Sequence, residues 1–375
     1  MKAIGNRKTS LDIVRITACY LVCSVHFFLN TNFYTYPLDT PKMYFYTALR
    51  SGCMICVPLF LVLSGYLMNK KTASLRYYWG LEKTLLTYLL ACLMCMFYKK
   101  YNIHWQIHAA DILNFTAAPY AWYVEMYIGL FLLIPFLNIV WNSLDTKNKK
   151  RGLVLTFLLL TALPSVLNTY QFDAASWWAK PSVSAAYLKI FPAWWTAFYP
   201  VTYYYIGAYL REFPTRFKKY QLFALVLLTA AGYGAYNCYR SYGSAFVWGD
   251  WQNWGALPLV LLTVLVFRFI ESFDMNRLPN FIRWLFARIS DLCLGTYLLS
   301  WIFDNNFYTF LNERVPEIPD RMKYFFIIPP LVFLIASAFS AVVYIIMKIT
   351  HFLIPIGDMI NKREEKKQAK IHPNS

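Results

Sequence analysis

The sequence predicts an all-α polytopic membrane protein, with about ten transmembrane helices in one bundle. Its 375 residues are 58% hydrophobic and only 15% charged, and the mean hydropathy is +0.38, whereas a soluble domain carries roughly 25% charged residues. Aromatic residues make up 19% of the chain, which suits long membrane–water boundaries. These observations exclude a soluble enzyme, a disordered chain and a nucleic-acid-binding domain.

The predicted spans follow from apolar segments of sufficient length, because a spanning helix needs about 20 mostly apolar residues. Only helices and closed barrels satisfy their backbone in lipid, and these segments are too long and uninterrupted for barrel strands. The third and fifth are short, and the fourth and ninth carry acidic residues. The segments are 11–31, 45–68, 84–98, 121–141, 152–168, 194–210, 220–238, 253–270, 289–310 and 326–349.

The lysines and arginines predict the orientation. With the N-terminus in the cytoplasm, inner segments hold 25 of the 36 basic residues and outer segments hold nine, while Arg15 and Arg50 lie within spans. This alternating excess indicates a multi-pass protein of the cell membrane with both termini cytoplasmic. It also accounts for the net charge of +17 through contact with anionic membrane lipids, without a nucleic-acid partner.

The termini and the cysteines carry less information about function. No small-residue cleavage pattern follows the first apolar segment, so we expect a retained span and not a removed signal peptide. Residues 351–375 read as a short charged cytoplasmic tail. The two C-x-x-C pairs, Cys53/Cys56 and Cys92/Cys95, lie inside apolar runs. They favour small apolar side chains packed in helices, and we expect no metal site.

The first span carries three ionisable residues, Asp12, Arg15 and His26. Such residues are costly in a membrane and are functional candidates by default. Eleven residues separate Arg15 from His26, so on a helix they share a face and lie about 16 Å apart along the axis. The alternatives are an arginine that snorkels to the interface and a hydrogen-bonded structural histidine. The shared face favours function.

Five segments, in order, resemble motifs of the acyltransferase-3 family of membrane acyltransferases. The first is Arg15-x10-His26 in the context LDIVRITACYLVCSVHF. The second, Val57 to Leu67, is similar to that family's V-P-x-F-x-x-x-S-G-Y-L stretch. The other three are Trp122-Tyr123 through Gly129-Leu130 to Pro135, Tyr205-Ile206-Gly207-Ala208-Tyr209-Leu210, and Ser290 through Gly295-Thr296-Tyr297-Leu298-Leu299.

The resemblance implies a transmembrane acyltransferase domain over residues 1–350. It implies transfer of an acyl group, commonly acetyl, from cytoplasmic acyl-CoA to a hydroxyl of a surface glycan or lipid-linked sugar. Acyl-CoA is then a co-substrate, and no bound cofactor is expected. Two departures stand out: Ser300 occupies a position where many relatives have histidine, and the cations after the S-G-Y-L stretch are mostly lysines.

On this reading His26 is the general base, because imidazole is suited to proton transfer at neutral pH. Glu125 is the first candidate to orient it and Asp304 the second. The donor's phosphates require cations at the inner face. The predicted donor-binding residues are Arg15, Arg76, Lys70, Lys71 and Lys83, and the predicted acceptor-binding residues are Arg50, Trp122, Tyr123 and Ser300.

Two other functions fit the same composition. In a transporter or flippase, Asp12, Arg15, His26 and Glu125 would line a path for substrate or protons. A sensory or scaffolding module would leave His26 unexplained. Ser64 and Gly65 resemble a small-residue packing face more than a group of catalytic donors.

Overall fold

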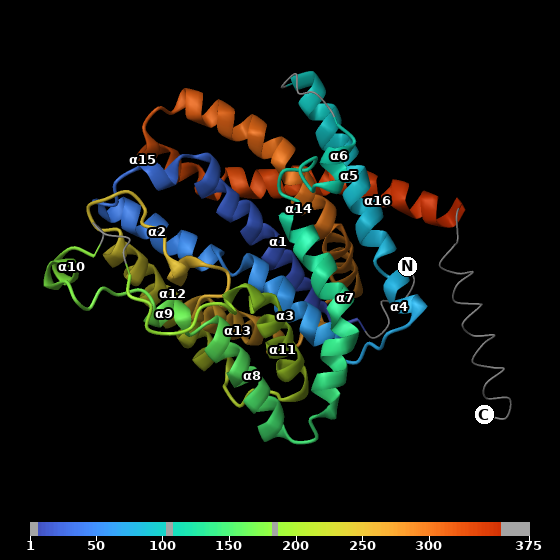
Figure 1. The fold of residues 1–375 in the computed structure, drawn as a ribbon. Coiled ribbons are helices and arrows are strands. Elements are labelled where there is room, and N and C mark those ends of the chain that lie inside the picture. Colours follow the sequence, from blue (N-terminus) through green and yellow to red (C-terminus); the bar gives the residue numbers. More distant parts are fainter. Residues whose placement is uncertain (1–6, 103–107, 182–186, 354–375) are drawn as a thin grey trace. The chain divides into compact units, whose positions relative to one another are not determined.

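The computed structural model describes residues 7–102, 108–181 and 187–353, without the side chains of 351–353 (Figure 1). Within these ranges the chain is helical and forms no β-strand, only an isolated bridge between Leu38 and Tyr242. The predicted all-α fold class is therefore confirmed. Of the predicted cytoplasmic tail, 351–375, the part from residue 354 onward lies outside the described residues.

Eight helical segments are long and apolar enough to cross a membrane, which confirms a polytopic protein but not the count of ten. The predicted spans 152–168 and 194–210 become α8 (Lys147–Thr161) and α11 (Tyr199–Glu212), with 15 and 14 residues, and both are shorter than the roughly 20 residues that span a bilayer. The eight segments are Thr9–Asn30, Pro41–Met68, Leu75–Asn102, Trp122–Ser143, Lys219–Arg240, Asp250–Arg277, Asn280–Arg314 and Ile328–Thr350.

The chain divides into two compact units. Unit 1 comprises residues 1–68, 144–291 and 303–333. The long helices α14 (Asn280–Arg314) and α16 (Ile328–Leu353) contribute residues to both units. The other elements of unit 1, besides α8 and α11, are α1 (Thr9–Asn30), η1 (Phe33–Thr35), α2 (Pro41–Cys53), α3 (Cys56–Met68), α9 (Pro164–Leu167), α10 (Ala175–Ala179), η2 (Thr196–Phe198), α12 (Lys219–Arg240), η3 (Asp250–Gln252), α13 (Leu257–Glu271), η4 (Met275–Arg277), α15 (Ile318–Arg321) and η5 (Met322–Phe326).

In unit 1, α1 packs against α2, α3 and α13, while α12 packs against α2 and α13. Helix α11 packs against α3 and α8. The contact between α3 and α11 brings backbone against backbone: a Cβ added at Gly65 would lie 1.9 Å from the carbonyl oxygen of Tyr204, and one at Gly207 would lie 2.1 Å from that of Val62. The predicted packing role of Gly65 is thus confirmed, since only glycine permits so close an approach.

Prolines explain two breaks within predicted spans. The span predicted over 45–68 is divided into α2 and α3, because Pro58 has no N–H to donate to the preceding turn. The span predicted over 152–168 is divided into α8 and α9 directly before Pro164, which likewise has no N–H to donate to the preceding turn.

Unit 2 comprises residues 69–143, 292–302 and 334–375. Tyr77 stacks on Phe131 with ring centroids 4.4 Å apart, and its hydroxyl donates to the Phe131 carbonyl at 2.5 Å. Gly295 of α14 lies against Ser340 of α16. Besides parts of α14 and α16, the elements of this unit are α4 (Leu75–Trp79), α5 (Glu82–Asn102), α6 (Ala110–Leu113) and α7 (Trp122–Ser143).

Candidate active site

The face of α1 that carries His26 meets α14 at Asp304. His26 Nδ1 lies 3.4 Å from Asp304 Oδ2, just beyond the usual range of N–H···O hydrogen bonds. His26 is 8% exposed and Asp304 only 1%. Catalytic hydrogen bonds are often longer in the absence of substrate. A buried imidazole beside a buried carboxylate is therefore the arrangement expected of a base and the group that orients it.

Aromatic residues lie next to this pair along α1 and α14. Phe27 follows His26 on α1 and contacts Tyr308, one turn beyond Asp304 on α14, with ring centroids 5.8 Å apart. Phe27 also contacts Phe325 of η5 at 5.4 Å. These side chains belong to a fully or nearly fully buried cluster. Such surroundings exclude water and strengthen the electrostatic interaction between imidazole and carboxylate.

The same two helices meet again near the other end of α1. Arg15 Nη1 donates to Ser290 Oγ at 3.0 Å. Since Arg15 and His26 both contact α14, the shared face predicted for them is turned toward one neighbouring helix. Arg15 is partly buried, and it lies about 16 Å from His26 along α1.

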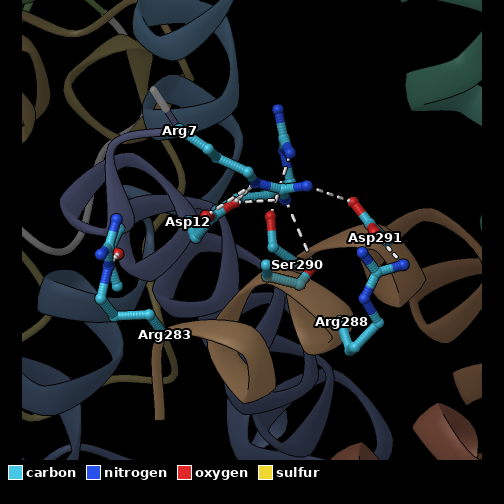
Figure 2. A network of polar contacts seen from close by, with 9 residues as sticks. Arg7, Asp12, Arg283, Arg288, Ser290 and Asp291 are labelled. Atoms are coloured by element: carbon cyan, nitrogen blue, oxygen red, sulfur yellow. Dashed lines mark hydrogen bonds and ion pairs between the residues drawn. The ribbon is translucent and has the colours of Figure 1, made fainter. Parts of the chain in front are cut away.

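Arg7 links the start of α1 to α14, and Figure 2 shows its guanidinium between the two acidic residues. Arg7 Nε donates to both carboxylate oxygens of Asp12, at 3.0 and 2.8 Å, and Arg7 Nη1 donates to Asp291 Oδ1 at 2.9 Å. Arg288 also pairs with Asp291, at 3.2 Å. Burial alone would lower the pKa of Arg7, but the hydrogen bonds and charges of Asp12 and Asp291 raise it above its ordinary value.

Sequence reasoning missed this network because it counted Arg7 only as a charge that sets topology. An acidic residue within the ninth predicted span, Asp291, was an available signal. The pairing itself depends on α1 and α14 being neighbours, which no spacing along the chain reveals.

Arg50, predicted to bind the acceptor, is fully buried in unit 1. Its guanidinium lies over the rings of Phe246, Trp248 and Tyr34, at 4.7, 5.2 and 5.5 Å from their centroids. Its Nε donates to the Tyr34 hydroxyl at 3.2 Å. Nη1 is buried, and the described residues provide no hydrogen-bond partner for it.

The other predicted site residues lie in unit 2. Glu125 is exposed near the start of α7, beside exposed Trp122 and half-buried Tyr123. Ser300 is fully buried, and its hydroxyl donates to the Tyr297 carbonyl at 2.9 Å. The four basic residues after the S-G-Y-L stretch that were predicted to bind the donor are all exposed; they are Lys70, Lys71, Arg76 and Lys83. Their roles stay predictions.

All eight cysteines are free, and all but Cys238 are buried. In the part of the chain that the structure describes, no group of three or more histidine, cysteine or acidic side chains is placed to hold a metal ion.

Comparison with known proteins gives one match. A family model described as "Acyltransferase domain", Acyl_transf_3, matches residues 8–348. Neither the curated proteins nor the solved structures contain a significant match.

Proposed function

The chain belongs to the acyltransferase-3 family, and we propose that it moves an acyl group, acetyl in the simplest case, from cytoplasmic acyl-CoA to a hydroxyl of an extracytoplasmic glycan or lipid-linked sugar. Membership in the family supports a membrane acyltransferase. The donor, the acceptor and the base are the parts that we propose here.

One observation carries the assignment of the base: the buried contact between His26 and Asp304, 3.4 Å apart on two helices that are distant in sequence. A buried carboxylate has a large desolvation cost, which is offset when it stabilises a neighbouring positive charge. Asp304 therefore acts as the positioning residue that Glu125 was first expected to be. Its charge favours the imidazolium formed during proton transfer.

The reaction follows from this geometry. Nδ1 of His26 faces Asp304, so Nε2 takes the proton from the acceptor hydroxyl as its oxygen attacks the thioester carbonyl carbon. A C–O bond forms and the C–S bond breaks. The CoA thiolate leaves and receives the proton from the imidazolium, so the products are the ester and free CoA.

The surroundings of Arg50 support an acceptor contact on the same unit. Phe246, which lies under the Arg50 guanidinium, contacts Phe33 at 6.1 Å, and Phe33 contacts Phe28 at 5.0 Å. A row of rings thus runs from the neighbours of His26 to a buried cation, one nitrogen of which has no hydrogen-bond partner among the described residues. Aromatic faces with a cation suit a sugar that carries hydroxyl or acidic groups.

The test uses the full-length protein in proteoliposomes with radiolabelled acetyl-CoA and extracted surface polysaccharide. We expect labelled ester from the wild type, and a rate lower by about 10²–10⁴-fold for His26→Ala, the usual contribution of a general base. His108→Ala is the matched control, because His108 is exposed. A wild-type rate for His26→Ala would overturn the assignment. A transporter would move its solute without any covalent label.

A further inference from the structure

A pocket of about 660 Å³ opens in unit 1, between three segments. Its volume lies within the range of small-molecule sites. The start of α1 forms one side, the segment leading into α12 forms another, and the end of α13 with the following turn forms the third. The charged residues that line it are Lys8, Lys218, Lys219, Arg268, Glu271 and Asp274.

The lining carries more positive than negative charge. Its two acidic residues are already paired: Glu271 with Arg268 at 2.5 Å, and Asp274 with Arg277 at 3.1 Å. The three lysines form no ion pair with a carboxylate anywhere in the described ranges; they are Lys8, Lys218 and Lys219. The uncompensated charge favours an anionic ligand.

The α1 side of the pocket adds backbone donors. Helix α1 has 22 residues, and the side chain at its N-cap, Lys8, forms no capping hydrogen bond. The first helical residues, Thr9 and Ser10, line the pocket. N–H groups at the start of a helix lack intrahelical acceptors and attract phosphate. The acidic residue of this first turn, Asp12, is itself paired with Arg7.

Tyr66, within the segment that resembles the S-G-Y-L motif, contacts two residues of the pocket lining. Its hydroxyl donates to Glu271 Oε1 at 2.5 Å, and Lys8 Nζ donates to the Tyr66 hydroxyl at 3.4 Å. The backbone carbonyl of Tyr66 accepts from Arg211 at 2.7 Å. A lysine and a paired carboxylate of the lining are thus positioned by one buried tyrosine.

The pocket and His26 share helix α1. Ser10 and His26 are 16 residues apart, which places them about 24 Å apart along the axis. A ligand that reaches both must be long and narrow, with its anionic part in the pocket. Acyl-CoA has this form, because its phosphates lie on the nucleotide and its thioester is at the far end of the pantetheine arm.

We propose that this pocket binds the phosphate-bearing nucleotide of the acyl donor, through Lys8, Lys218, Lys219 and the first turn of α1. The proposal rests on the proposed function, because that function supplies the donor. The headgroup of an anionic phospholipid offers the same phosphate chemistry, so the experiment must separate the two sources.

The experiment measures binding of radiolabelled CoA to the full-length protein in nanodiscs of phosphatidylcholine, with Lys218→Gln, Lys219→Gln and the double variant. Each substitution removes one charge-assisted contact, so we expect CoA binding to weaken about tenfold per lysine and more steeply at low salt. The matched control is Lys149→Gln, since Lys149 is exposed and paired with Asp145. Thermal unfolding of each variant verifies that it is folded.

Transfer kinetics and a ligand series complete the test. The variants should raise KM for acyl-CoA and leave kcat unchanged, and pantetheine, which has no phosphate, should compete equally poorly in all proteins. Unchanged CoA affinity in the double variant overturns the proposed role of the pocket. If the wild type still transfers the acyl group in that case, the proposed function stands. If the double variant loses phosphatidylglycerol binding, measured in a second set of nanodiscs that contain this lipid, and keeps its CoA affinity, the pocket is a lipid site and the proposal is overturned. A wild type that neither binds CoA nor transfers label overturns the function as well.

Discussion

Replacing Asp304 by asparagine tests the reaction at its most specific point. The carboxylate lies 3.4 Å from His26 Nδ1 and is 1% exposed. With an effective dielectric constant of about 20, a pair of unit charges at this distance is stabilised by about 5 kcal/mol. Asparagine keeps the volume and an acceptor oxygen but loses the charge.

This interaction energy sets the ceiling on the effect. Each 1.36 kcal/mol corresponds to a factor of ten in rate, so full loss would cost more than three orders of magnitude. Because asparagine keeps an acceptor oxygen beside the imidazole, we expect kcat to fall by about 10²–10³-fold. KM for acyl-CoA should change little, since the charge acts on the transition state.

The assay is acyl transfer in proteoliposomes at saturating donor, with thermal unfolding measured on the same preparations. Asp304→Glu should recover part of the lost rate, because it restores the charge. Asp320→Asn is the control, since Asp320 is 59% exposed and pairs with Lys42 at the surface. A kcat for Asp304→Asn within twofold of the wild type, in a folded protein, refutes the reasoning. So does a loss of activity that only parallels a loss of fold.

Two further predictions concern stability. Gly65→Ala places a methyl group 1.9 Å from a backbone carbonyl of α11, so we expect the free energy of unfolding to fall by about 3 kcal/mol or more and the Tm in detergent to fall with it. The control is Gly52→Ala, whose methyl group meets no atom within 4 Å and should not lower the Tm. Equal Tm values for the two variants would contradict the close contact. Arg7→Gln leaves buried Asp12 without its guanidinium, and because Arg7 is one-third exposed solvent screens part of the effect, so we expect about 1–3 kcal/mol by chemical denaturation. Exposed Arg277→Gln is the matched control, and equal stability of the two variants would refute a structural role for Arg7.

The first helix could be predicted well from the sequence. Helical periodicity alone placed Arg15 and His26 on one face, and in the structure both contact α14. Periodicity did not decide between Glu125 and Asp304 as the partner of His26, because each is an acidic residue near the predicted outer end of a span. Only the arrangement of the helices brings Asp304 to the imidazole.

Helix ends were harder to predict than helix existence. The ninth span was expected from residue 289, but α14 begins at Asn280. Its first turns include Arg283 and Arg288. A hydropathy criterion assigns such charged residues to a loop, although arginine is compatible with a helix. The pocket was not predicted for a related reason: Lys218 and Lys219 were counted only as charges that set the membrane topology. Charge counts give the side of the membrane but not the cavity that a side chain lines.

The glycine contact between α3 and α11 also limits how the protein can move. A shift of one residue between these helices would drive a side chain into a main-chain oxygen, since the gap accepts only hydrogen at Gly65 and Gly207. The two helices must therefore behave as a single rigid piece. Rocking of one against the other, as in alternating access, is therefore closed to this pair of helices.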